Sequence, residues 1–135
     1  MDVSIVSAER AVWRGEADLV IARSPEGEFG IMRGHIPFLA ALVPGLVKVR
    51  NGGSYEQFLV SGGFLEASGP ADQYHVIVLA DDAEEVGDID DAELARRIEE
   101  ARRVKSEDET RDRSDAALRA SLAAGERATG EYSSR

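Results

Sequence analysis

A change of composition near residue 81 divides this chain into two parts that favour different secondary structures. Residues 1–80 hold all four prolines, ten of the thirteen glycines and seven of the eight aromatic residues. Residues 81–135 hold seventeen acidic and ten basic residues, many alanines and few bulky side chains. Proline and glycine mark turns and break helices, whereas alanine favours helices. We therefore expect two domains, a strand-rich one over residues 1–82 and a helical one over residues 83–135.

Short apolar segments recur in the first part at the intervals typical of a β-sandwich. Residues 47–50 alternate between valine and a basic residue, as a half-buried strand does. The Asn-Gly-Gly at 51–53 predicts a hairpin turn, and residues 69–72 predict a second turn. No helical crossover fits between these segments, so we expect an all-β, antiparallel sandwich. The expected strands are 3–7, 18–22, 45–50, 55–60, 64–67 and 74–79.

The second part is expected to form an α-helical hairpin. Asp90 with Glu93 resembles a capping box at the start of a first helix. The polar run 106–110 is interpreted as a linker, and residues 112–128 are expected to form a second helix. Both helices carry thin apolar faces, so we expect a hairpin of low intrinsic stability that depends on what it packs against.

Charge and composition exclude several classes of partner. The chain has 26 acidic and 16 basic residues, a net charge of -10, and no cysteine. Such a surface repels phosphate backbones, so nucleic acid is not an expected partner. The longest uncharged apolar run, residues 36–47, is too short and too broken by prolines to cross a bilayer. Any association with a membrane is therefore expected to be indirect, through another protein.

No residue pattern indicates a catalytic or metal site. Ser61 precedes two glycines, but the G-x-S-x-G elbow is missing and a glycine turn explains the pattern better. Hydrolysis by His35 with Glu28 or Ser61 is disfavoured, because no nucleophile, base and orienting group form a set. The acidic cluster at 81–91 lacks calcium-loop spacing and is interpreted as a solvated connection. We expect no cofactor, no metal and no catalysis by this chain alone.

The most specific motif begins at residue 27, and its sequence is Gly27-Glu28-Phe29-Gly30-Ile31-Met32-Arg33-Gly34-His35-Ile36-Pro37. Ser61-Gly62-Gly63-Phe64-Leu65-Glu66 follows it further along the chain. Together these resemble the bacterial epsilon subunit of F-type ATP synthases, whose pattern reads roughly G-E-x-G-I-L-P-G-H-x-P and then S-G-G-x-L-E. The resemblance covers the first ninety residues.

This resemblance implies a docking role for the first motif. In the epsilon family the corresponding Glu and His lie at the end of the sandwich that meets the ring of c subunits. Carried over, these are Glu28 and His35, and the shaped loop would also present Met32 and Arg33. Arg33 stands where the family pattern has proline, so the loop is expected to be less rigid and to bring a positive charge to the ring. The alternative is that these residues only make a tight connection between strands.

A second motif of the family concerns ATP. Several bacterial epsilon subunits carry I-D-x-x-R-A at the start of the first helix, which binds ATP and holds the helices down. Here the arginine position holds Glu93, and a carboxylate repels phosphate where a guanidinium would pair with it. We therefore expect weak or no ATP binding.

The resemblance also implies contacts between the helical arm and the catalytic subunits. The expected contact residues are Arg111, Arg113, Arg119 and Arg127. The alternative is that these arginines pair with Glu109 and Asp115 on a solvated helix.

Taken together, the resemblance implies a non-catalytic rotor-stalk subunit at the cytoplasmic face of the cell membrane, bound peripherally. It would bind the gamma subunit and the c ring and couple proton flow to ATP synthesis. Its arm would reach the catalytic alpha and beta subunits and restrain ATP hydrolysis. A free-standing β-sandwich adaptor that binds a soluble protein is the alternative function.

Overall fold

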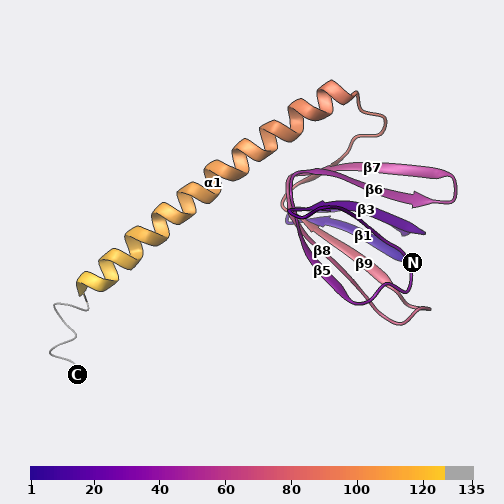
Figure 1. Ribbon diagram of the computed structural model, residues 1–135, viewed down its shortest axis with the longest axis horizontal. Helices are drawn as coiled ribbons and strands as arrows, with labels where there is room; N and C mark the ends of the chain where they lie inside the picture. Colours follow the sequence, from indigo (N-terminus) through magenta and orange to yellow (C-terminus); the bar gives the residue numbers. More distant parts are fainter. Residues whose placement is uncertain (127–135) are drawn as a thin grey trace. The chain divides into compact units, whose positions relative to one another are not determined.

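The structure is a computed structural model that describes the backbone of residues 1–126 and the side chains of residues 1–108, 110 and 111. It divides into two compact units, Met1–Arg102 and Arg103–Arg135. The first unit holds ten strands in two layers (Figure 1). These are β1 (Asp2–Ser7), β2 (Ala11–Glu16), β3 (Leu19–Ser24), β4 (Gly27–Ile31), β5 (Phe38–Leu42), β6 (Gly45–Asn51), β7 (Ser54–Val60), β8 (Gly63–Ser68), β9 (His75–Ala80) and β10 (Ala83–Glu85).

The two layers are five-stranded sheets, and they confirm the predicted sandwich. The first sheet has the order β2-β1-β9-β8-β5 and the second has the order β10-β7-β6-β3-β4. All neighbouring pairs are antiparallel except β1 and β9, which run parallel. These two strands lie far apart in sequence, so no hairpin constrains their direction. The prediction of an entirely antiparallel sandwich was therefore wrong for the β1–β9 pair.

Both predicted turns are confirmed. The hairpin of β6 and β7 closes at Asn51 and Ser54, and Gly52 adopts a φ of 63° that favours glycine. Strands β8 and β9 pair antiparallel across the second turn. All six predicted strands are present, and the strands that sequence patterns missed are β2, β4, β5 and β10.

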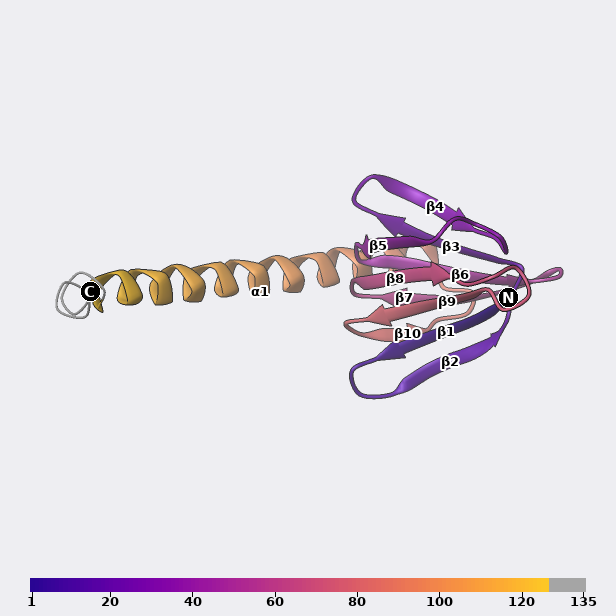
Figure 2. The same cartoon turned by 90° about the horizontal axis from the view of Figure 1, so that it is seen from below.

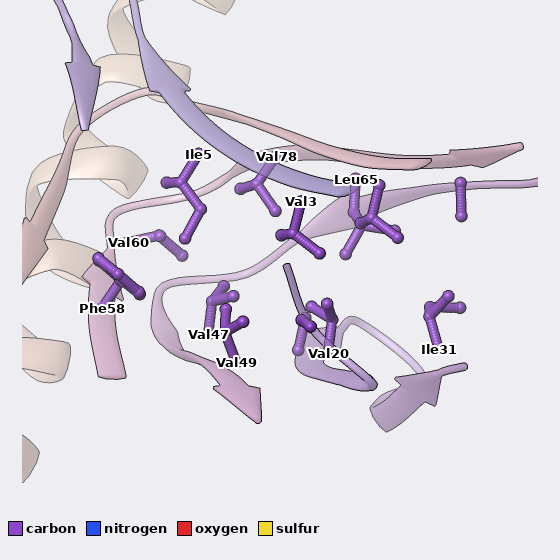
Figure 3. Packing of buried hydrophobic residues seen from close by; sticks show 14 of the residues in the cluster. Val3, Ile5, Val20, Ile31, Val47, Val49, Phe58, Val60, Leu65 and Val78 are labelled. Carbon is purple, nitrogen blue, oxygen red and sulfur yellow. The ribbon is translucent and has the colours of Figure 1, made fainter. Parts of the chain in front are cut away.

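The core lies between the sheets and is built from alternate strand residues. Figure 3 shows Val3, Ile5 and Val78 of the first sheet facing Val47 and Val49 of the second. Phe58 is fully buried, and the half-buried ring of Trp13 lies against it at a centroid distance of 5.8 Å. Among the described residues, no charged or polar residue is buried. Hydrophobic burial between the sheets is therefore the main source of the sandwich's stability.

One helix follows the sandwich, α1 (Asp91–Glu126). The predicted break at 106–110 was wrong, because these residues lie within a continuous helix. The chain has no proline or glycine between residues 91 and 124, so nothing in the backbone chemistry ends the helix there. Among the described residues, no helix combines the length and apolar character needed to span a membrane.

Candidate functional site

The connection between β4 and β5 lies at one end of the sandwich, together with the chain's N-terminus and the turn between β8 and β9 (Figure 2). Strand β4 belongs to the second sheet and β5 to the first, so the chain crosses between the layers here. Facing sheets lie about 10 Å apart, which accounts for the length of the connection. Three of the predicted contact residues lie in this connection: Met32, Arg33 and His35.

A tight turn shapes the connection. The N–H of His35 donates to the carbonyl oxygen of Met32 at 3.1 Å, which closes a four-residue turn. Gly34, at the third position, has a φ of 87°, as a type II turn requires. Arg33 occupies the second position, where proline is common. The hydrogen bond and Gly34 therefore close the turn without the proline ring.

The ring of His35 is held in place by its neighbours. Its Nδ1 lies 2.8 Å from the carbonyl oxygen of Ile36, which accepts the hydrogen bond when Nδ1 carries the proton. The ring meets Phe38 edge-on at 5.4 Å, and Phe38 in turn contacts Phe29 at 5.2 Å. Two exposed apolar side chains flank it, Met32 at 56% and Ile36 at 74% exposure. The connection thus combines an oriented imidazole with exposed apolar surface.

Glu28 does not share the connection with the other three residues. It lies in β4, exposed, and faces Arg23 of β3 in the pairing register. At about 3.3 Å per strand residue, it lies roughly 13 Å along the chain from Met32. Opposite charges facing each other across a strand pair stabilise that pair modestly. The structure therefore brings Met32, Arg33 and His35 together and sets Glu28 apart on the neighbouring strand.

A hydrogen-bonded carboxylate ties two more loops together. Asp18 follows β2 and accepts hydrogen bonds from Arg50 Nε at 2.7 Å and from the N–H of Gly52 at 3.0 Å. The pKa of the Asp18 carboxyl lies below its ordinary value of 3.8, mainly because of the hydrogen bond from Arg50 and next because of the one from Gly52. Asp18 thus joins the β2–β3 and β6–β7 turns.

The outer face of the first sheet carries an apolar row that sequence reasoning missed. The register aligns Phe64 of β8 with Leu79 of β9 and Ala41 of β5, and Leu79 with Val6 of β1. Phe64 and Leu79 are 54% and 53% exposed. Leu39, two residues before Ala41 on the same face of β5, is also exposed. We call Val6, Leu39, Ala41, Phe64 and Leu79 the outer apolar row. The available signal was the pair Phe64-Leu65, since two successive apolar residues place one on each face of a strand.

The start of α1 has its charges paired within the chain. The side chain of Asp90 accepts from the N–H of Ala92 at 2.7 Å and of Glu93 at 3.3 Å, which caps the helix. Glu93 bonds Arg96 at 2.6 Å, and this hydrogen bond lowers the pKa of Glu93. Arg97 pairs with Glu84 of β10. The arginines nearest to Glu93 are therefore already bound to carboxylates.

The predicted arginines of the arm are only partly described. Arg111 is exposed on α1. Arg113 and Arg119 lie within α1, and Arg127 lies outside the described residues. Positions two apart lie about 200° apart around a helix axis, so α1 does not bring Arg111 and Arg113 to one face.

Ser61 has a structural setting. Its hydroxyl donates to the carbonyl oxygen of Asp82 at 3.4 Å, and its N–H donates to the same oxygen at 3.0 Å. Gly62 and Gly63 follow with φ values of 125° and 131°. The described residues contain no group of three or more His, Cys, Asp or Glu side chains placed to hold a metal ion.

The family described as "ATP synthase, Delta/Epsilon chain, beta-sandwich domain" matches residues 1–86. The ATP synthase epsilon chain of Chromohalobacter salexigens is 45% identical over 98 residues, covering 72% of this chain and 67% of that protein. The epsilon chain of Shouchella clausii is 37% identical over 124 residues, covering 90% of each.

Solved structures give the same result for the fold. A chain in the Euglena gracilis mitochondrial ATP synthase, in a structure of OSCP, F1 and c-ring, superposes with a TM-score of 0.58 and 29% identity. The match covers 74% of this chain and 62% of that one. A chain of the Tetrahymena thermophila central stalk and c-ring, at 15% identity and a TM-score of 0.53, shares the fold. These matches do not favour the free-standing adaptor, and we conclude that this chain belongs to the ATP synthase epsilon-chain family, as an epsilon subunit.

Proposed function

We propose that this epsilon subunit is a non-catalytic part of the central stalk that connects the gamma subunit to the c ring. In that position it would couple proton flow through the ring to ATP synthesis, bound peripherally at the cytoplasmic face of the cell membrane. The observation that carries the proposal is that the sandwich offers two separate contact surfaces. One is the β4–β5 connection at its end, and the other is the outer apolar row on its side.

The c ring is the proposed partner of the end surface. Met32 and Ile36 expose apolar area beside the oriented ring of His35, and Arg33 adds a charge. Exposed apolar groups among polar ones are typical of a protein contact. The similar chain of Euglena gracilis belongs to an ATP synthase structure that includes the c-ring, which supports this assignment. Glu28 would contribute from the neighbouring strand.

The gamma subunit is the proposed partner of the outer apolar row. Phe64 and Leu79 lie opposite each other on adjacent strands and expose more than half of their surface. Neighbouring strands lie about 4.8 Å apart, so a row over four strands spans roughly 14 Å. A contiguous apolar strip of this kind favours association with another protein over exposure to water. Two partners on two faces are what a connecting subunit requires.

The arm is proposed to contact the alpha and beta subunits and to restrain hydrolysis, without a nucleotide switch. Arg111, Arg113, Arg119 and Arg127 remain the proposed contacts with acidic surfaces of those subunits. Weak or absent ATP binding is supported by Glu93, whose carboxylate holds Arg96 at 2.6 Å. A phosphate would have to displace that carboxylate to reach the guanidinium.

Proton pumping by the reassembled complex tests the proposed docking. Glu28→Arg combined with His35→Glu reverses the charge on β4 and replaces the oriented imidazole with a carboxylate. We expect ATP-driven pumping into vesicles to fall several-fold, while soluble ATPase activity and the unfolding midpoint of the isolated chain change little.

Glu9→Arg is the matched control for the Glu28 change, since Glu9 is exposed in the turn between β1 and β2 of the first sheet, whereas Glu28 lies on β4, an edge strand of the second sheet. It should leave pumping intact. Undiminished pumping by the double variant would assign Glu28 and His35 to a structural role and refute their part in docking.

A further inference from the structure

Glu66 places a carboxylate within the apolar part of the first sheet's outer face. Strands β5, β8 and β9 lie side by side in this sheet (Figure 2), and Glu66 belongs to the middle one. The register places Leu39 of β5 on one side of it and Ile77 of β9 on the other. Phe64 lies two residues before it on the same face of β8. Side chains directly opposite each other have Cβ atoms about 4.5–5.5 Å apart, so apolar side chains border this carboxylate on three sides.

This carboxylate has no partner within the described part of the chain. Glu66 is exposed, and its side chain takes part in no hydrogen bond or ion pair among the described residues. His75 lies diagonal to it across the β8–β9 pair, but the Nε2 of His75 is 3.4 Å from the hydroxyl of Ser68. Glu66 also ends the motif that begins at Ser61, and no contact of the described residues accounts for a charge at this position.

The other carboxylates that the described strands place on this face already have partners. Asp2 binds Arg14 with an N–O distance of 3.1 Å, and Glu16 binds the amino group of Met1 at 3.2 Å. The unpaired charge of the face is therefore negative, as is the net charge of the chain, -10. Interfaces bring charges of opposite sign together, so this face fits a partner that supplies a positive charge.

We propose that Glu66 binds a basic side chain of the gamma subunit when that subunit covers the outer apolar row. This inference rests on the proposed docking of the gamma subunit to the row. A partner that packs on Leu39, Phe64 and Leu79 removes water from the carboxylate among them, and a buried charge without a partner is strongly unfavourable. A guanidinium or ammonium group beside Glu66 offsets this loss of water through a charge-assisted hydrogen bond. The apolar side chains then supply contact area, and the ion pair fixes the partner's position along the strands.

Binding of the full chain to the soluble complex that contains the gamma subunit but lacks this chain tests the ion pair. Glu66→Gln keeps the shape of the side chain and removes its charge. It should raise the Kd at least about 10-fold, because the partner's cation is then left unpaired. Glu66→Asp keeps the charge on a shorter side chain and should recover part of the affinity. Glu66→Leu should also weaken binding, whereas a purely apolar interface would gain affinity from it.

Glu56→Gln is the matched control, since Glu56 is exposed on β7 of the second sheet and the change in net charge is the same. It should leave binding unchanged, and weakening equal to that of Glu66→Gln would reduce the effect to net charge and overturn the proposal. Unchanged or tighter binding of Glu66→Gln, or tighter binding of Glu66→Leu, would overturn it too. The Glu66 variants should keep the wild-type unfolding midpoint, because Glu66 is exposed and its side chain has no partner among the described residues.

Leu79→Ser separates the ion pair from the docking face, because it removes an exposed apolar side chain of the row and no charge. It should weaken binding. If Leu79→Ser weakens binding and Glu66→Gln does not, the ion pair is refuted and the proposed contact with the gamma subunit stands. If neither variant weakens binding, the proposed contact of the row with the gamma subunit is refuted as well.

Discussion

Gly63 should be the least replaceable residue of the S-G-G motif, and the structure gives the size of the effect. Its φ of 131° lies in a region that other residues rarely adopt. A Cβ placed there would lie 2.1 Å from the carbonyl oxygen of Leu79 and 2.9 Å from Ala80 Cα, both backbone atoms. Backbone strain costs about 1–3 kcal/mol, and a forced shift of packed atoms costs about the same again. We therefore expect Gly63→Ala to lower the free energy of unfolding by about 4 kcal/mol.

Two other glycines separate strain from collision. Gly27 has nearly the same φ, 128°, but beyond its chain neighbours nothing lies within 4 Å of the position that a methyl group would take, so Gly27→Ala carries the strain alone. Gly53 has neither feature, and Gly53→Ala should be nearly neutral. The expected order of destabilisation is Gly53→Ala, then Gly27→Ala, then Gly63→Ala.

Urea unfolding of the isolated chain measures this series. Trp13, the chain's one tryptophan, packs against the buried Phe58 and reports on the core by fluorescence. A loss of about 4 kcal/mol corresponds to a fall in Tm of roughly 15–30 °C for a domain of this size. If Gly63→Ala unfolds at the same urea concentration as Gly27→Ala, the close approach to Leu79 has no energetic weight and the reasoning fails.

Three further predictions concern the domain boundary, acid stability and nucleotide. A chain ending at Gly87 should keep a cooperative thermal transition, whereas one ending at Asp82 should melt at a lower temperature, because it loses β10 and the buried Ala83. Equal melting temperatures would show that β10 does not stabilise the sandwich and that the domain can end at residue 82. Asp18→Asn should lower the free energy of unfolding at neutral pH and match the wild type well below pH 3.8, because the lowered pKa of Asp18 in the folded chain gives stability that is lost as pH falls through it. Urea titrations over a pH series measure this effect. A difference in free energy of unfolding that stays constant with pH would show that the charge of this carboxylate is not the cause. Calorimetric titration with ATP and magnesium should show a Kd weaker than about 0.1 mM, roughly -5.5 kcal/mol, and tighter binding would refute the interpretation of Glu93.

The strands that sequence patterns missed share one property. Strands β2, β4, β5 and β10 are the four edge strands of the two sheets. An edge strand pairs on one side only. Strands β2, β4 and β10 mix charged residues with apolar ones, and β5 is apolar throughout, so none of the four shows a regular apolar and polar alternation in its sequence. The six interior strands were all predicted: β6, β8 and β9 alternate buried side chains over most of their length, and β7 ends in an apolar run, Phe58–Val60, that is buried throughout.

The candidate site was predictable in its residues and less so in its arrangement. The motif at 27–35 indicated a glycine-permitted turn, which the φ of Gly34 bears out. Closeness in sequence suggested that Glu28 joins Arg33 and His35, but an extended strand separates them. A recess at this end of the sandwich brings residues 1–2, 16, 33 and 71–75 together only after the sheets have formed, so the sequence alone could not predict it.

Coupling between pumping and hydrolysis shows whether this chain connects the stalk to the ring. The complete complex, reassembled in vesicles with and without this chain, is assayed for ATP hydrolysis and for ATP-driven proton uptake in the same preparation. We expect that omitting the chain abolishes proton uptake while hydrolysis continues, and that adding it back restores uptake. Equal proton uptake per ATP hydrolysed with and without the chain would contradict a role as the connection between stalk and ring.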